Sequence, residues 1–132
     1  MVSTGRNDEV DELVFSLPHS PDSVRSARLA VRGALASLDG GVVEMSALLV
    51  DELVANAVVH GEGAITLVVV VHPDCVRITV ADAGTMLPVH QPPSSRSESG
   101  RGLSIVNAAA SRWGVDATDH PKWVWFELEV PR

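Results

Sequence analysis

The sequence has few features of nucleic-acid-binding, disulfide-linked or membrane-spanning proteins. It carries 10 Lys and Arg against 17 Asp and Glu, and the resulting net charge of −7 argues against a surface for phosphate backbones. Cys75 is the only cysteine, which excludes an internal disulfide and a cluster of thiolate metal ligands. The longest mainly apolar stretch, Ala64–Val71, is too short to cross a bilayer.

The N-terminus has no basic segment followed by an apolar one, so no secretory signal is visible. Hydrophobic residues make up 45% of the 132 residues, which fits one compact domain with a core. We therefore expect a cytoplasmic protein in which residues 1–11 are flexible and residues 12–132 form a single domain.

Apolar periodicity predicts an alternation of strands and helices along the chain. Asp39-Gly40-Gly41 is expected to separate the first two helices, and Gly61 to cap the second in a left-handed conformation. This order implies an α+β fold, a two-layer sandwich with helices on one face of a mixed, mainly antiparallel sheet. The expected elements are an edge strand at 12–17, helices at about 21–38 and 42–60, a hairpin at 65–71 and 76–81, a helix at 103–113, and strands at 114–118 and 123–130.

Three polar residues, Glu52, Asn56 and His60, lie at intervals of four in the second expected helix. At helical pitch these positions form one stripe. The residues around them are mostly apolar. A carboxylate and a carboxamide one turn apart on an apolar helix are costly to bury unless something binds them, so the stripe predicts a ligand.

Two further polar motifs are the Asp82-Ala83-Gly84 segment, where a strand ends, and the Gly100–Leu103 segment, where a helix begins. A carboxylate at a strand end can accept a hydrogen bond from an exocyclic amine such as that of adenine, and a following glycine lets a ring approach. Glycines at a helix start expose N–H groups that suit phosphate; Arg101 could add donors or face solvent. An asparagine on a neighbouring helix can hold Mg²⁺, and a carboxylate one turn earlier can polarise a hydroxyl.

The stretch between these two motifs has no periodicity and is rich in Pro, Ser, Gly and Gln. A loop of this length in so small a chain is unusual and is generally functional or mobile.

The segments ELVANAVVHG, VADAG and SGRGLSIV resemble, in this order and spacing, the N-box, the adenine-binding Asp box and the ATP-lid glycine box of the GHKL ATPase superfamily. Within it, the chain is most similar to the small stand-alone anti-sigma-factor serine/threonine kinases common in actinobacteria. The early SVRSARLAV helix, Trp113-Gly114-Val115 and the terminal KWVWFELEVP support this resemblance, which covers about residues 12–130.

The resemblance implies a Bergerat-type fold with ATP and Mg²⁺ as cofactors. Glu52 would be the general base that activates the hydroxyl of a protein substrate, and Asn56 would ligate the metal at the nucleotide. Asp82 would read the adenine amine, with Gly84 making room for the ring.

The lid loop would span about 83–100. At its end the residues implied to contact the phosphates are Gly100, Arg101, Gly102 and Leu103. Lys122 matches a family lysine near the start of the last strand, without an assigned role. Two positions depart from the family pattern, because Met86 stands where a second glycine is common and Pro121 where a glycine commonly precedes the lysine.

The resemblance also implies partners, namely a sigma factor, an anti-sigma antagonist protein or both, and a possible homodimer. The activity would be phosphorylation of Ser or Thr on the antagonist. The alternative is an ATP-dependent protein-binding switch without kinase turnover, in which the long loop orders over the nucleotide. Neither a nucleic acid nor a membrane is expected as a partner.

Structural explanations compete with functional ones at several of these residues. His60 can close the C-terminus of its helix, where a partly positive imidazole is favoured. An exposed charged helix face or a partner-binding surface would explain Arg25, Arg28 and Arg32. Core or sheet packing, rather than cofactor binding, is expected for Trp113, Trp123 and Trp125.

Overall fold

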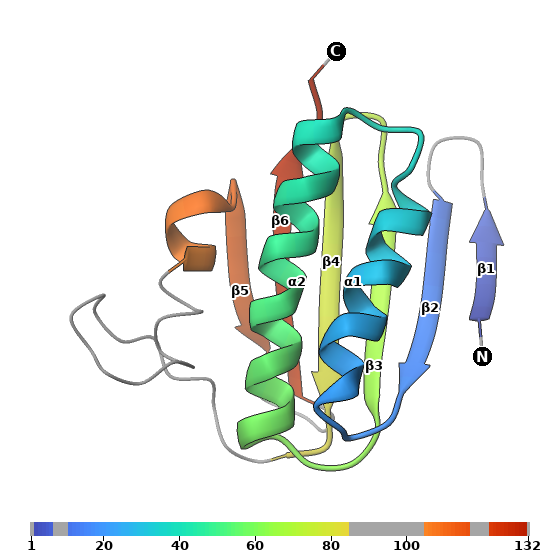
Figure 1. Ribbon diagram of the computed structural model, residues 1–132. Helices are drawn as coiled ribbons and strands as arrows, with labels where there is room; N and C mark the ends of the chain where they lie inside the picture. Colours follow the sequence, from blue (N-terminus) through green and yellow to red (C-terminus); the bar gives the residue numbers. More distant parts are fainter. Residues whose placement is uncertain (1, 7–10, 85–104, 117–121, 132) are drawn as a thin grey trace.

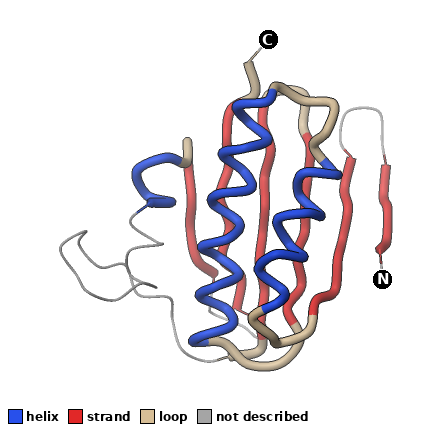
Figure 2. The backbone as a smooth tube through the Cα atoms, viewed as in Figure 1, coloured by secondary structure: helices blue, strands red, loops and turns tan. Residues whose placement is uncertain are grey.

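A computed structural model describes residues 2–6, 11–84, 105–116 and 122–131. Two helices cover one face of a six-stranded sheet whose strand order is β1-β2-β3-β4-β6-β5 (Figures 1 and 2). The elements are β1 Val2–Arg6, β2 Asp11–Leu17, α1 Asp22–Ala34, α2 Gly40–His60, β3 Ile65–Val71, β4 Cys75–Asp82, β5 Arg112–Asp116 and β6 Lys122–Glu129.

The predicted α+β sandwich is confirmed, but its sheet is not mixed. Each strand pairing among the described residues is antiparallel. The hairpin of β3 and β4 forms as predicted, with Val71 opposite Val76 at its turn. Two-residue alternation and β-branched side chains in these segments explain why the local sequence sufficed there.

The N-terminal part of the sheet differs from the prediction. Val2–Arg6 forms β1, which pairs with β2, so the expected flexibility of residues 1–11 does not describe this strand. The segment expected as an edge strand therefore has neighbours on both sides, β1 and β3. Strand pairing uses backbone groups, which every residue except proline supplies, so a polar segment can join an edge without an apolar pattern.

The junction between the two helices is also organised differently. Helix α1 ends at Ala34, four residues before the predicted end, whereas α2 already begins at Gly40. The side chain of Asp39 caps α2 by accepting hydrogen bonds from the N–H groups of Gly41 and Val42 at 3.0 and 3.4 Å. The two glycines thus start a helix rather than separate two helices.

The end of α2 shows a second correction. Gly61 has φ −93° and ψ −174°, an extended conformation and not the predicted left-handed cap. The positive φ lies two residues later, at Gly63, with a value of 71°. The chain therefore leaves α2 in an extended direction and turns afterwards toward β3.

The predicted helix at 103–113 is shorter at its C-terminal end than expected. Residues 105–109 are helical, and β5 begins at Arg112, so Trp113 and Gly114 belong to a strand. A Cβ on Gly114 would lie 2.9 Å from the ring of Trp125. Gly114 therefore lets a tryptophan of the neighbouring strand pack over the backbone, rather than ending a helix.

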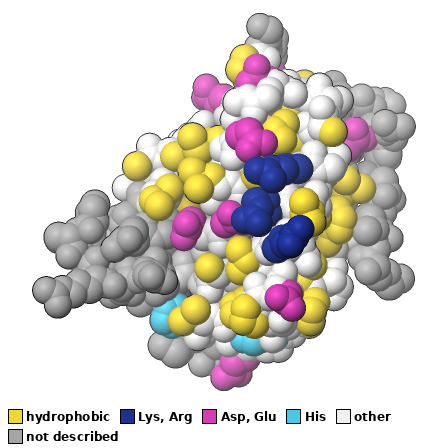
Figure 3. Space-filling view, viewed as in Figure 1, with side chains coloured by type: hydrophobic (Ala, Val, Ile, Leu, Met, Phe, Trp, Pro, Cys, Tyr) yellow, Lys and Arg dark blue, Asp and Glu magenta, His cyan; other side chains and the backbone are white. Residues whose placement is uncertain are grey.

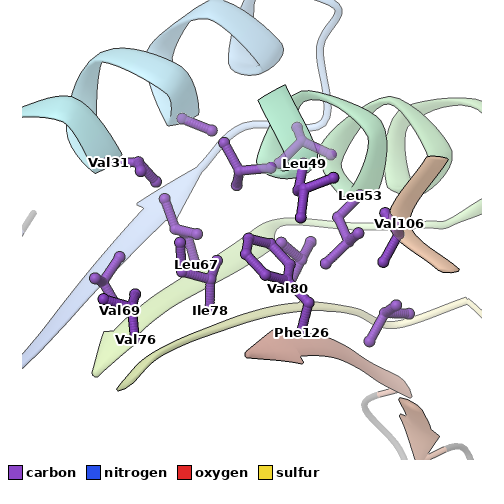
Figure 4. Close-up of a cluster of buried hydrophobic side chains, with 14 of the residues drawn as sticks. Val31, Leu49, Leu53, Leu67, Val69, Val76, Ile78, Val80, Val106 and Phe126 are labelled. Atoms are coloured by element: carbon purple, nitrogen blue, oxygen red, sulfur yellow. The ribbon is translucent and has the colours of Figure 1, made fainter. Parts of the chain in front are cut away.

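The core fills the space between the helices and the inner face of the sheet (Figure 4). Alternate residues of each central strand point toward the helices and are buried, as the two-residue period of a strand requires. Examples from the sheet are Leu67, Ile78 and Phe126, which meet Leu49 and Leu53 of α2 and Val31 of α1.

No helix of the described residues covers the other face of the sheet (Figure 2). There the guanidinium of Arg77 lies 4.0 Å from the ring centroid of Trp125, and Glu127 forms ion pairs with Arg77 and Arg112 at 3.3 and 2.5 Å. These contacts agree with the prediction that Trp125 packs on the sheet. Among the described residues, no helix has the length and apolarity needed to cross a membrane.

Candidate functional site

A small cleft lies between the C-terminal half of α2 and the adjoining ends of β4 and β6. Its volume is about 10 Å³, close to the space that one water molecule needs. A cleft of this volume can therefore contact the edge of a planar ring but cannot enclose the ring. The lining residues are Leu53, Asn56, Ala57, His60, Val80, Asp82, Lys122 and Val124.

Strand register determines which polar residues reach this cleft. Asp82 is the last residue of β4 and Lys122 the first of β6, and the antiparallel register places them opposite each other. Val80 and Val124 form the next inward-facing pair. Both polar side chains thus end up beneath the last turns of α2, where Asn56 and His60 are located.

Asn56 has an incomplete set of hydrogen bonds. Its side chain is 6% exposed, and Nδ2 donates to the carbonyl of Glu52 at 3.2 Å. Its Oδ1 is buried, and no described residue donates a hydrogen bond to it. A buried acceptor without a partner costs about 1–3 kcal/mol, so a cation or donor at this oxygen would recover free energy.

Asp82 is held in one orientation by its surroundings. Its Oδ1 accepts hydrogen bonds from the N–H groups of Gly84 at 2.7 Å and Glu62 at 3.4 Å. Its Oδ2 lies 3.3 Å from Nζ of Lys122, and the two side chains are 3% and 5% exposed. The carboxylate is therefore aligned by backbone donors on one side and by an ammonium group on the other.

Two glycines make this arrangement possible. A Cβ on Gly84 would lie 2.8 Å from Oδ1 of Asp82, and a Cβ on Gly61 would lie 2.5 Å from its Cγ. Both positions thus permit the backbone to approach the carboxylate closely. Gly84 was expected to make room for a ligand ring, and the structure shows that it makes room for Asp82 itself.

The family model of the histidine kinase-like ATPase domain matches residues 17–128. The chain belongs to this family. The match confirms the predicted GHKL-type fold. It also places the N-box and the Asp box of this ATPase domain within the matched range.

A solved structure shows the same fold. The RsbU and RsbW domains of Rv1364c from Mycobacterium tuberculosis match with a TM-score of 0.72 and 20% identity, over 92% of this chain and 33% of that one. The chain thus spans about a third of that structure. A histidine kinase domain from the blue-light-activated kinase of Erythrobacter litoralis EL346 matches with a TM-score of 0.48 and 15% identity, over 86% and 61%. No curated protein sequence matches the chain.

The chemistry of the side chain at position 56 is compatible with the magnesium ion that the resemblance implies. Mg²⁺ prefers oxygen ligands and commonly takes only one or two from the protein, the others coming from phosphates and water. The unpartnered Oδ1 of Asn56 fits such a ligand. Within the described ranges, no group of three or more His, Cys, Asp or Glu residues could hold a metal instead.

The structure separates the three members of the polar stripe on α2. Asn56 and His60 line the cleft, whereas Glu52 is half-buried and is not among its lining residues. His60 is also the last residue of α2, as the structural explanation for it expects. The phosphate motif at Gly100–Leu103 and the lid loop after Gly84 lie outside the described residues.

The sequence motifs assign Lys122 no role, although it contacts the carboxylate of Asp82 in the cleft. One signal in the sequence pointed to it, because Lys122 is the only lysine of the chain and stands in an apolar strand. Lysine is almost never fully buried unless it is paired. The pairing with Asp82 depends on strand register across 40 residues, which the motifs do not reveal.

The arginines of α1 lie at the surface, as predicted for a charged helix face (Figure 3). Arg28 and Arg32 form ion pairs of 3.0 Å with Asp51 and Glu44 of α2. These two contacts join the helices. Because the groups are partly exposed, each pair is expected to add less than about 1 kcal/mol to stability.

Proposed function

We propose that this protein is a Mg²⁺- and ATP-dependent serine/threonine kinase of the anti-sigma-factor type. Its substrate would be an anti-sigma antagonist protein, and the phosphorylation would regulate a sigma factor. The observation that carries the proposal is the unpartnered oxygen of Asn56 in the same cleft as the fixed carboxylate of Asp82. The family match supports nucleotide binding, and the resemblance to anti-sigma kinases supports the choice of substrate.

In this proposal the two ends of the nucleotide meet different parts of the chain. Asp82 accepts a hydrogen bond from the exocyclic amine of adenine. Gly100, Arg101, Gly102 and Leu103 contact the phosphates through backbone N–H groups and the guanidinium. Asn56 holds the magnesium ion, which when bound neutralises charge on the phosphate oxygens.

Glu52 would act as the general base. Its carboxylate takes the proton of the substrate serine or threonine hydroxyl as that oxygen bonds to the γ-phosphorus. The bond between this phosphorus and the β,γ-bridging oxygen breaks, and ADP leaves. Positioning of the reacting groups supplies most of the rate acceleration in phosphoryl transfer. One general base on a helix is therefore sufficient as the proton acceptor.

The test uses the purified chain, γ-labelled ATP and an antagonist protein encoded near its gene. Glu52→Gln should lower the transfer rate by about 10²- to 10⁴-fold, because it removes the base while keeping the shape. Its affinity for Mg²⁺-ATP should stay that of the wild type. Glu44→Gln is the matched control, since Glu44 lies on the same helix but pairs with Arg32 at the surface.

Two outcomes would reject the catalytic proposal. Unchanged transfer by Glu52→Gln would remove the assigned base. ATP-dependent binding of the antagonist with no phosphate transfer by the wild type would instead favour the protein-binding switch.

A further inference from the structure

The floor of the cleft carries a hydrogen-bond donor and an acceptor side by side. Nζ of Lys122 lies 3.3 Å from Oδ2 of Asp82, and both side chains are at least nine-tenths buried. Leu53, Ala57 and Val124 line the cleft around them, together with the polar side chains of Asn56 and His60. A ligand that reaches this floor therefore meets one negative and one positive group side by side.

The fold itself does not require a charged pair at this position. The other inward-facing pairs between β4 and β6 are apolar, namely Val80–Val124, Ile78–Phe126 and Val76–Leu128. A buried ion pair is commonly no more stable than a well-packed apolar pair, because both ions lose their hydration. Packing alone thus gives no reason for the only lysine of the chain to be buried here.

Lys122 is also not needed to orient the carboxylate. Oδ1 of Asp82 already accepts two backbone hydrogen bonds, from Gly84 and Glu62. An ammonium group has three N–H donors, so a lysine can hold an ion pair and still donate to a ligand. Each carboxylate oxygen can likewise accept more than one hydrogen bond. A ligand can therefore contact both groups without breaking the ion pair between them.

Adenine presents the complementary pair of groups on one edge. Its exocyclic N6 donates hydrogen bonds, and the adjacent ring nitrogen N1 accepts one. Guanine has an acceptor where adenine has a donor and a donor where adenine has an acceptor, namely a carbonyl at position 6 and an N–H at position 1. The two purines present these groups at the same places when the sugar and phosphates fix the orientation of the base. An adjacent acceptor and donor in the protein can thus distinguish the two purines.

We propose that Lys122 is a base-reading residue, which donates from Nζ to N1 of adenine while Asp82 accepts from N6. This inference rests on the proposed function, since it concerns the same nucleotide. Lys122 would add a positively charged contact with the adenine base. The carboxylate of Asp82 alone would recognise only the exocyclic amine of adenine.

The test compares ATP with 1-deaza-ATP, in which a C–H group replaces N1. Wild-type protein should bind 1-deaza-ATP about 10- to 100-fold more weakly, the range expected for loss of a hydrogen bond to a charged group. Lys122→Met should bind ATP as weakly as the wild type binds 1-deaza-ATP and should no longer distinguish the two. Arg25→Met is the control for loss of a positive charge, because Arg25 is exposed on α1.

A second measurement needs no substitution. Because Lys122 is the only lysine, selective ¹⁵N labelling of lysine gives one Nζ resonance. ATP should shift this resonance and slow exchange of its protons with water, whereas 1-deaza-ATP should do so much less.

The outcomes separate this inference from the proposed function. Equal affinity of the wild type for ATP and 1-deaza-ATP would overturn the role of Lys122 while leaving nucleotide binding intact. Failure to bind ATP at all would overturn both proposals. ATP binding with the expected discrimination but no phosphate transfer would support base reading and contradict only the kinase.

Discussion

The backbone N–H of Gly84 donates to Oδ1 of Asp82 over 2.7 Å, across a turn that leaves no space for a Cβ between them. The turn and the carboxylate therefore constrain each other. Glycine at position 84 is therefore one of the features that hold the acid at the end of β4 in its orientation.

Gly84→Ala should consequently displace Asp82 and lower the free energy of unfolding by about 1–3 kcal/mol, the usual cost of overpacking. The added Cβ would also lie 3.0 Å from Cα of Gly61 and 3.1 Å from N of Glu62, so backbone as well as side chain must shift. Urea denaturation measures the change. Gly33→Ala is the control, because a Cβ there meets nothing within 4 Å in helix α1. It should leave stability unchanged or raise it by up to about 1 kcal/mol.

Asn56→Leu should separate stability from ligand binding. The substitution removes a buried oxygen without a partner, so the free energy of unfolding should change by less than about 1 kcal/mol. Affinity for Mg²⁺-ATP, measured by calorimetry, should nevertheless fall at least tenfold. Ser46→Ala removes another buried oxygen without a described partner on the same helix, outside the cleft, and should keep full affinity. Wild-type affinity in Asn56→Leu would contradict the assigned metal ligand.

The ion pair of Lys122 and Asp82 should show strong coupling in a double-mutant cycle. Each single change, Lys122→Met or Asp82→Leu, removes one partner of a buried ion pair and should cost about 3–5 kcal/mol of unfolding free energy. The double variant places apolar groups at both positions, as in the neighbouring Val80–Val124 pair, and should lose much less than the sum. Additive losses in chemical denaturation would mean that the two groups do not interact.

The reactivity of Cys75 gives a prediction about pH. Burial raises the pKa of the Cys75 thiol above its usual value, and the carboxylate of Glu127 raises this pKa further. Glu127→Gln removes this negative charge, so that Arg112 and Arg77, which favour the thiolate, are opposed only by burial and by Asp74. The pH midpoint for alkylation by iodoacetamide should therefore fall, because the thiolate is the reacting form. Glu44→Gln, on the helical side of the molecule, should leave the midpoint unchanged, and a rise in Glu127→Gln would contradict the expected sign.

Several elements were predictable because their signals are local. The β-branched runs at 65–71 and 76–81 indicated the hairpin, and the spacing of polar and apolar residues around Asn56 indicated a helix. The first residues of a strand and the ends of a helix were harder to place. Trp113 continues the pattern of the preceding helix, yet contacts with β6 place it in a strand.

The sequence by itself determined the order of the elements from β2 to β6 and the family. Periodicity, turn residues and motif spacing act over a few positions and can be read along the chain. Tertiary structure alone decided that β1 completes the edge of the sheet and that Lys122 faces Asp82. Strand register decides both, and it depends on backbone pairing and on burial between segments far apart in the sequence.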